Sequence, residues 1–322
     1  MFLYNKGTKN LVLSGWRLCA AIKRLPSGYA IYEGENNKVD KAIQQKVNDL
    51  IEVLKQTTEG KCAIALAGAH AKGTADASSD IDFYIFAEAA KSFEERRHLI
   101  RSVADKGTEP WIDTAFDATP WGGTMDFMYQ GTPVETTART LSAMDKAVAD
   151  CLNGKFEIIP ATWTSNGYYT FIYLCELSFI KPVWDPDGVL AAYQRQTAVY
   201  PTALRRSIIE TFMDRANTWI DNFHYESAVR RADILFTAPI VLHTVMDMIQ
   251  VIFALNRIYF TGDKKLEAAL SKMEYCPAAL LSNISFLMSA PRDSEQLGLQ
   301  RQLLRQIRDE LSEKAEAAYR EG

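Results

Sequence analysis

The chain has 322 residues, of which 48% are hydrophobic and 24% are charged, and its formal net charge at pH 7 is −4. This length allows two domains with separate hydrophobic cores. The mild acidity argues against a dedicated nucleic-acid-binding protein, which normally carries a basic face. The five cysteines are scattered, odd in number and without a C-x-x-C pair, so they predict reduced thiols rather than a disulfide framework.

Residues 1–37 combine basic residues, glycines and aromatics without a steady period, and we treat them as an N-terminal appendage. Their apolar stretch at residues 11–22 is interrupted by Arg17 and followed by Lys23. A secretory signal needs an uninterrupted apolar segment. We therefore expect no signal peptide here.

The first regular pattern is helical and lies in residues 39–54, where apolar residues recur three and four positions apart. Two short apolar runs follow at residues 63–67 and 83–86, and each is typical of a buried strand. A polar loop separates the two runs. We therefore expect a helix, a strand, a loop and a second strand in that order.

Two carboxylates stand at the start of the second strand. Asp80 and Asp82 are separated by Ile81. Because side chains at i and i+2 of a strand point to the same face, both carboxylates face one way while Ile81 enters the core. Two like charges this close are costly unless a cation neutralises them. Such oxygen ligands favour a divalent ion, most often Mg²⁺ beside a phosphate group.

The loop after the first strand has the composition of a phosphate-binding turn. Gly68 allows a tight turn of the backbone, and the amides at the start of the next helix offer an anion site. A phosphate cradle beside a metal pair predicts a site for nucleotide transfer. The residues expected to bind the nucleotide in this loop are Gly68, Ala69, Lys72, Gly73 and Ser79.

This stretch resembles the signature of the DNA polymerase β-like nucleotidyltransferase superfamily, in which a strand ends in Gly-Ser or Gly-Gly and an Asp-x-Asp follows on the next strand. The match consists of Gly68, Ala69, Gly73, Ser79, Asp80 and Asp82. The chain departs from the signature at Ala69, where the usual serine hydroxyl helps to hold the terminal phosphates. The resemblance implies a mixed sheet with flanking helices, a pair of Mg²⁺ ions and ATP as the nucleotide substrate.

The elements after the Asp-x-Asp strand are less regular. Residues 93–103 predict an amphipathic helix, and residues 111–116 predict a short strand. Residues 125–130 and 133–139 predict two strands joined by a hairpin turn at residues 131–132.

The predicted hairpin matters because this chemistry uses a third carboxylate, which can complete the metal site or act as a general base. Glu135 on the second hairpin strand fits the position of the superfamily's third acid, and Asp126 on the first hairpin strand is the alternative. The expected catalytic and metal-binding set is therefore Asp80, Asp82 and Glu135.

Beyond residue 150 the pattern becomes helical. Helical spacing fills residues 168–180, 189–199, 204–222, 229–260, 265–273, 278–288 and 294–319. We therefore expect an α+β protein with a nucleotidyltransferase domain at residues 38–150 and an all-α helical bundle at residues 151–322.

The helical half has a resemblance of its own. The runs VWDPDGVLAAY, YPTALRRSII and ALNRIYFTGDKKL resemble segments of a group of bacterial two-domain nucleotidyltransferases. Their architecture is also that of the aminoglycoside and lincosamide nucleotidyltransferases, where a lysine of the helical domain reaches the triphosphate. The resemblance therefore implies nucleotide contacts from Lys264 and Lys265, where a cation offsets charge on the leaving group. Trp111, Trp121 and Trp163 either line an acceptor pocket or belong to the core.

The sequence thus predicts a Mg²⁺-dependent enzyme that moves AMP from ATP to a hydroxyl of a small molecule and releases pyrophosphate. An aminoglycoside- or lincosamide-type antibiotic is the example that the architecture suggests. Two alternatives stay open. One is transfer of AMP to a protein hydroxyl. The other is an impaired nucleotide-binding or interaction protein, of which Ala69 would be the first sign.

The remaining expectations concern partners and location. The sequence shows no pattern of basic residues interleaved with aromatics, which is typical of RNA- or DNA-binding surfaces. We therefore expect no nucleic-acid partner. Residues 234–255, a long apolar run, contain His243, Asp247 and Gln250 and therefore predict a buried helix rather than a membrane span. We expect a cytoplasmic protein, either monomeric or a homodimer.

Overall fold

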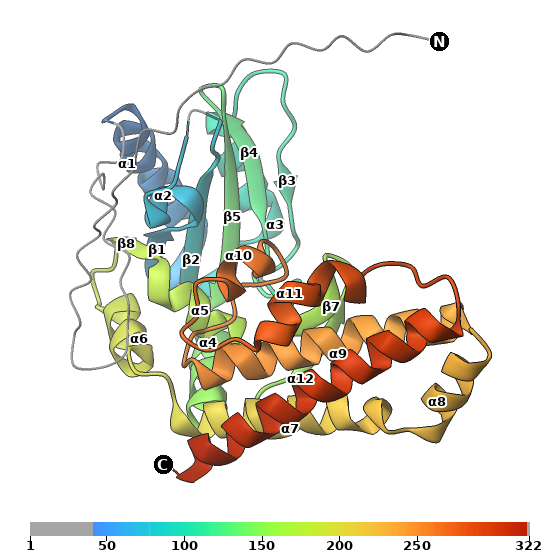
Figure 1. Ribbon diagram of the computed structural model, residues 1–322. Helices are drawn as coiled ribbons and strands as arrows, with labels where there is room; N and C mark the ends of the chain where they lie inside the picture. The colour runs from blue at the N-terminus through green and yellow to red at the C-terminus, as the bar shows by residue number, and fades with distance from the viewer. Residues whose placement is uncertain (1–40, 77, 321–322) are drawn as a thin grey trace, which may run out of the picture. The chain divides into compact units, whose positions relative to one another are not determined.

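The computed structural model describes residues 41–320 except residue 77, so the predicted N-terminal appendage lies outside the described residues. Within them the chain has a mixed α+β fold with a six-stranded sheet and many helices, which confirms the predicted class (Figure 1). The first part of the described chain comprises α1 (Lys41–Gln56), β1 (Thr58–Leu66), α2 (Gly68–Lys72), β2 (Ile81–Ala90), α3 (Phe93–Val103), β3 (Trp111–Ile112), β4 (Met125–Tyr129), β5 (Thr132–Thr140) and α4 (Leu141–Leu152).

The second part mixes short strands with longer helices. It comprises β6 (Ile158–Ala161), β7 (Thr164–Tyr169), α5 (Ile172–Phe179), β8 (Lys181–Trp184), α6 (Val189–Thr197), α7 (Thr202–Ile220), α8 (Phe223–Arg230), α9 (Ile234–Leu255), α10 (Leu266–Leu270), α11 (Ala278–Leu287) and α12 (Ser294–Arg320).

The large sheet has the order β3-β4-β5-β2-β1-β8. Strand β2 runs parallel to β5 and antiparallel to β1, and the other neighbouring pairs are antiparallel. The mixed sheet that the superfamily resemblance implied is therefore present.

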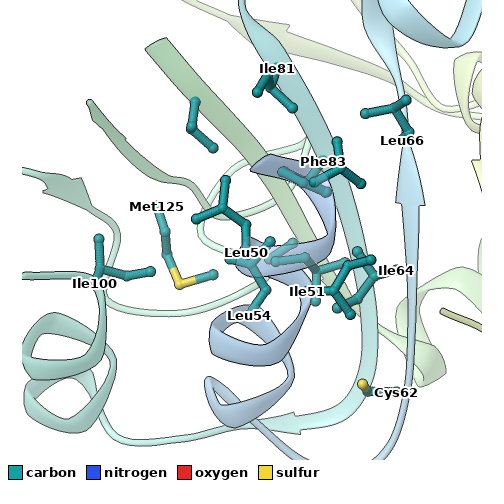
Figure 2. Close-up of a cluster of buried hydrophobic side chains, with 14 of the residues drawn as sticks. Leu50, Ile51, Leu54, Cys62, Ile64, Leu66, Ile81, Phe83, Ile100 and Met125 are labelled. Atoms are coloured by element: carbon teal, nitrogen blue, oxygen red, sulfur yellow. The ribbon is translucent and has the colours of Figure 1, made fainter. Parts of the chain in front are cut away.

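One face of this sheet packs against the apolar core. Strand β2 contributes Ile81, Phe83 and Ile85, which pack with Leu50 and Leu54 of helix α1 and with other buried side chains (Figure 2). Strand alternation therefore works as predicted, because Ile81 enters the core while the residues on either side of it face the other way. The opposite face of β2 carries Asp82 and Tyr84 and, further along the strand, the buried Phe86.

Local signals explain several element boundaries. Helix α3 begins with a capping box, in which the Ser92 hydroxyl accepts from the Glu95 amide and the Glu95 carboxylate accepts from the Ser92 amide. The hairpin between β4 and β5 turns at Gln130 and Gly131, which both have positive φ angles, as two-residue hairpin turns require. The sequence placed this turn at residues 131–132, one residue later than the structure does.

The second half departs from the prediction of helices alone. Strands β6 and β7 form a separate two-stranded sheet, and β8 joins the edge of the large sheet beside β1. These three strands have only four to six residues, too few to give a clear period, and the end of β7 was mistaken for the start of a helix. The expected long helix at 229–260 is divided between α8 and α9, because Ala232 has a positive φ and Asp233 caps α9. The domain boundary at residue 150 stays a prediction.

Helix α9 is, among the described residues, long and apolar enough to cross a membrane. However, 78% of its most apolar 18-residue window is buried inside the protein, which is typical of a core helix. Asp247 in this helix is buried and pairs with Arg215 at 3.0 Å between Oδ1 and Nε. The helix is therefore the buried core element that the sequence predicted, whereas the cytoplasmic location stays a prediction.

Candidate active site

Three carboxylates meet on the face of the sheet opposite the apolar core. One carboxylate oxygen from each of Asp80, Asp82 and Glu135 lies within 4.8 Å of the others. The parallel pairing of β2 with β5 sets Asp82 directly beside Glu135, and strand alternation places Asp80 on the same side. The structure therefore brings together the three residues that the sequence selected as a metal-binding set.

Gly68 makes a close approach to one of these carboxylates. A Cβ atom at this position would lie 1.6 Å from Oδ2 of Asp82, and the φ angle of +54° lies in the left-handed region. No larger residue fits without displacing Asp82. The sequence predicted glycine here for a tight turn, and the contact with Asp82 is a second reason that only the structure reveals.

Two of the three carboxylates, those of Asp82 and Glu135, have raised pKa values. Burial raises the pKa of Asp82 to about 7, the charges of Asp80 and Glu135 add to the rise, and Lys72 opposes it. Burial also raises the pKa of Glu135, with a further contribution from Asp80, whereas Lys264 lowers it. The protein thus gathers negative charge where little water compensates it. A divalent cation with hard oxygen ligands fits this donor set.

Two lysines face the carboxylates from different parts of the chain. Lys72 at the end of α2 influences Asp82, and its Nζ lies 4.0 Å from the centre of the Phe179 ring of α5. Lys264 precedes α10 and influences Glu135. Lys264 is therefore close enough to the acids to act on Glu135, and its predicted contact with the nucleotide stays a prediction. Lys265, which has a positive φ, is not among the charges that shift the pKa of Glu135, and its role stays a prediction.

The loop residues proposed for nucleotide binding have mainly local contacts. The Ser79 hydroxyl accepts from the Asp76 amide at 2.9 Å, so it closes the loop before β2. Gly73 ends α2 in a left-handed conformation, and its amide donates to the Ala69 carbonyl. Helix α2 has only five residues. The assignment of Ser79, Ala69 and Gly73 to the nucleotide stays a prediction.

Asp126, the alternative third acid, lies outside the three-carboxylate cluster. Its Oδ1 accepts from the Thr136 amide of β5 at 2.9 Å. Burial raises its pKa to about 6, and the Glu135 charge adds to the rise against the Thr136 hydrogen bond. Glu135 is therefore better placed than Asp126 to complete the metal-binding set.

The sequence did not reveal a buried polar network on the same sheet face. Arg139 of β5 pairs with Glu176 of α5 at 2.5 Å, and the Tyr84 hydroxyl donates to the same carboxylate at 3.0 Å. Tyr84 follows Asp82 by two positions on β2, so the network lies next to the acidic cluster. These contacts join strands to a helix far along the chain, and no local pattern predicts them.

His70 in α2 was also missed. It is buried, and its Nε2 has no hydrogen-bond partner among the described residues. Burial lowers the pKa of His70, whereas Asp80 raises it. A histidine after a glycine turn has no distinctive sequence signal.

The three tryptophans considered for an acceptor pocket have different environments. Trp111 is 70% exposed at the sheet edge, and Trp163 is 83% exposed beside β7. The Trp121 ring lies 6.5 Å from the Tyr168 ring. Neither exposed ring belongs to the core, so the core alternative is wrong for Trp111 and Trp163.

Comparison with known proteins gives limited information. Residues 180–266 match the model of a family described as a domain of unknown function, DUF4037, and the matched segment runs from the residue before β8 to the start of α10. No curated protein matches the chain. The fold is similar to the crystal structure of a nucleotidyltransferase-like protein from Exiguobacterium sibiricum 255-15, with 8% identity, a TM-score of 0.46, and coverage of 85% of this chain and 77% of that one. This similarity is too low to transfer fold or function.

Proposed function

We propose that the protein is a Mg²⁺-dependent nucleotidyltransferase that moves a nucleoside monophosphate, AMP from ATP, onto a hydroxyl of a small molecule. The observation that supports this most is the meeting of Asp80, Asp82 and Glu135, with Asp82 pressed against the Gly68 turn. Three crowded carboxylates cost stability, so they are better explained by chemistry than by folding.

The metal site consists of Asp80, Asp82 and Glu135. Mg²⁺ bound there would withdraw charge from the phosphate groups of the nucleotide. The Gly68–Lys72 helix α2 lies against Asp82 and faces the phosphates, and Lys72 and Lys264 offset their negative charge.

Glu135 is the residue that we assign to proton removal, because it is the most exposed of the three acids and its pKa is raised. The hydroxyl oxygen of the acceptor forms a bond to the α-phosphorus, and its proton passes to the Glu135 carboxylate. The bond from the α-phosphorus to the bridging oxygen breaks, and pyrophosphate leaves with the electron pair. The attacking and leaving oxygens lie in line.

The test is a transfer screen with purified protein, Mg²⁺ and labelled ATP or GTP. Acceptors are a panel of aminoglycoside and lincosamide antibiotics and, separately, a cell lysate, and the readouts are pyrophosphate release and the mass of the product. We expect a nucleotide adduct on a small molecule that is lost in Asp80→Ala and Asp82→Ala, with unchanged circular dichroism.

Other results would redirect the proposal. Label on a lysate protein alone would indicate transfer to protein hydroxyls. ATP binding without transfer to any acceptor would indicate an impaired nucleotide-binding protein, with Ala69 in place of the usual serine as the first candidate cause. Transfer that survives both aspartate substitutions would remove the metal site from the mechanism.

A further inference from the structure

The charge of Lys72, the lysine beside Asp82, lies over an aromatic ring from a distant part of the chain. Its Nζ is 4.0 Å from the centre of the Phe179 ring, at the end of α5. An ammonium group within about 6 Å of a ring centre is attracted by the π-electrons of the ring. Among the described residues Lys72 has no salt bridge and no side-chain hydrogen bond, so the ring contact is what restricts its position.

The pairing of β1 with β8 brings the two residues together. Leu66, the last residue of β1, pairs with Lys181, the first residue of β8. Helix α2 begins two residues after Leu66, and α5 ends two residues before Lys181. Because the two strands are antiparallel, the end of β1 and the start of β8 lie at the same edge of the sheet. The topology therefore sets the end of α5 beside α2.

A second residue of α5 responds to the same lysine. Cys175 lies four positions before Phe179, so the two side chains share one face of the helix. Burial raises the pKa of the Cys175 thiol to about 12, and the charge of Lys72 opposes this rise. Lys72 is therefore close to this face of α5 at more than one point.

Helix α5 is itself fixed to the strands that carry the acids. Its Glu176 pairs with Arg139 of β5 and accepts a hydrogen bond from the Tyr84 hydroxyl of β2. At the end of the helix, the Gln194 amide of α6 donates to two backbone carbonyls at 3.0 and 2.9 Å. The Phe179 ring thus belongs to a helix that is held at both ends of its last turns.

A lysine restricted in this way loses less freedom when it binds a phosphate group. A free lysine side chain has many rotamers, and fixing it against a ligand costs conformational entropy. The Phe179 ring has already removed part of that freedom in the folded protein. Lys72 also lowers the pKa of Asp82, so its charge lies near the metal-binding carboxylates before a nucleotide arrives.

We propose that Phe179 is a positioning residue, which holds the Lys72 ammonium group beside Asp82 so that it can pair with the phosphates of the nucleotide. This inference rests on the proposed function and deepens it, because it gives helix α5 of the second part of the chain a share in nucleotide binding. Phe179 acts through Lys72 and does not touch the nucleotide. Its loss should therefore lower the affinity for the nucleotide.

The experiment is calorimetric titration of α,β-methylene ATP, which cannot transfer its α-phosphate, into full-length protein with Mg²⁺. Phe179→Leu removes the ring and keeps an apolar side chain, whereas Phe179→Tyr keeps the ring. Trp184→Leu is the matched control, because the Nζ of Lys55 lies 3.9 Å from the centre of the Trp184 ring. That contact is of the same kind, but Lys55 influences the Cys62 thiol and is not among the charges that shift the pKa of Asp82 or Glu135.

We expect Phe179→Leu to weaken binding of the analogue by about twofold to tenfold. Phe179→Tyr should keep the wild-type affinity, and Trp184→Leu should leave it unchanged. Lys72→Met should weaken binding by at least as much as Phe179→Leu. In the Lys72→Met background, Phe179→Leu should have no further effect, because the ring acts through the ammonium group. Circular dichroism and the melting temperature show whether each variant is folded.

Several outcomes would overturn the positioning role. These are unchanged binding in Phe179→Leu, an equal loss in Trp184→Leu, and a loss in Phe179→Tyr as large as that in Phe179→Leu. A Phe179→Leu effect that persists in the Lys72→Met background would show that the ring acts through packing alone.

The titration of the wild type separates this failure from that of the proposed function. A wild type that does not bind the analogue with Mg²⁺ contradicts nucleotide transfer, and the role of Phe179 falls with it. A wild type that binds the analogue, with an affinity that Phe179→Leu does not change, removes the positioning role and leaves nucleotide transfer in place.

Discussion

Two groups of charged residues lie side by side on one face of β2 and β5, and they are treated in opposite ways. In the first, Arg139 is buried with Glu176, and the Tyr84 hydroxyl and the Trp121 carbonyl bond to the remaining polar atoms. In the second, Asp80, Asp82 and Glu135 crowd together with lysines only nearby. The first group is complete and structural. The second has no such pairing, and the proposed function completes it with a cation from outside the chain.

The largest expected effect on stability comes from removing one partner of the buried Arg139–Glu176 pair. Arg139→Met leaves the Glu176 carboxylate buried without its partner, and this should lower the free energy of unfolding by about 3–5 kcal/mol. The double variant Arg139→Met/Glu176→Leu should recover most of the loss, because no charge then stays unpaired. Urea unfolding measures both. A single variant within about 1 kcal/mol of wild type would show that the pair contributes little to stability.

For Glu135 in the acidic group, the main expected effect is on the catalytic rate. Glu135→Gln should lower kcat by about 10²-fold or more, because it removes the proposed base. Asp126→Asn is the matched comparison, and it should change kcat by less than about tenfold, since Asp126 is held by the Thr136 amide outside the cluster. Steady-state kinetics with a transferable acceptor decide this. A larger kcat loss in Asp126→Asn would make Asp126 the third acid.

The acidic group was largely predictable because its signals are local. The alternation of Asp80, Ile81 and Asp82 determines which side chains share a face, and the glycine turn precedes them in the same short stretch. Glu135 was selected through the superfamily resemblance, and its neighbour Asp82 is determined by the pairing of two strands. The exposed Trp111 was named together with Trp121 and Trp163 as part of either an acceptor pocket or the core, and no local pattern separates the three.

The buried group around Arg139 and Glu176 could not be predicted, because its partners are distant in the sequence. The Tyr84–Glu176 hydrogen bond joins residues 92 positions apart. Strand β8 was missed for a related reason: four residues give no clear period, and only pairing with β1 makes them a strand. Local pattern therefore predicts the acidic cluster of this protein better than it predicts the contacts between its two halves.

Removing a charge from the acidic group should stabilise the metal-free protein. The pKa of Asp82 is about 7 in the folded state against 3.8 for an ordinary aspartate. Between these values the folded state keeps a proton that the unfolded state has lost, so the stability contribution of Asp82 falls as pH rises from about 4 to 7 and is level above that. Asp82→Asn should therefore be more stable than wild type by about 1–3 kcal/mol at pH 8.

The two proteins should have similar stability near pH 3, where Asp82 is largely protonated in both states. Urea unfolding at several pH values, with a metal chelator present, tests this. Adding Mg²⁺ at pH 8 should raise the melting temperature of the wild type but not of Asp82→Asn. A variant that is less stable than wild type at pH 8 would contradict the crowding of charge at this position.

The smallest effect is expected from the lysine that approaches the acids from the second half of the chain. Lys264 is exposed and lowers the pKa of Glu135, so its interaction with the bound phosphates is partly screened by solvent. Lys264→Ala should raise the KM for ATP by about threefold to tenfold and leave kcat within about threefold. The effect should shrink as the salt concentration rises from 0.05 to about 0.5 M.

Lys265→Ala is the matched control for this measurement, because the neighbouring lysine is not among the charges that shift the pKa of Glu135. Equal KM changes in the two variants would indicate a diffuse positive field around the α10 turn rather than a specific contact. A change in Lys265→Ala alone would move the contact by one residue. A change in Lys264→Ala alone would mean that the second half of the chain supplies a cation to a site whose carboxylates all belong to the first.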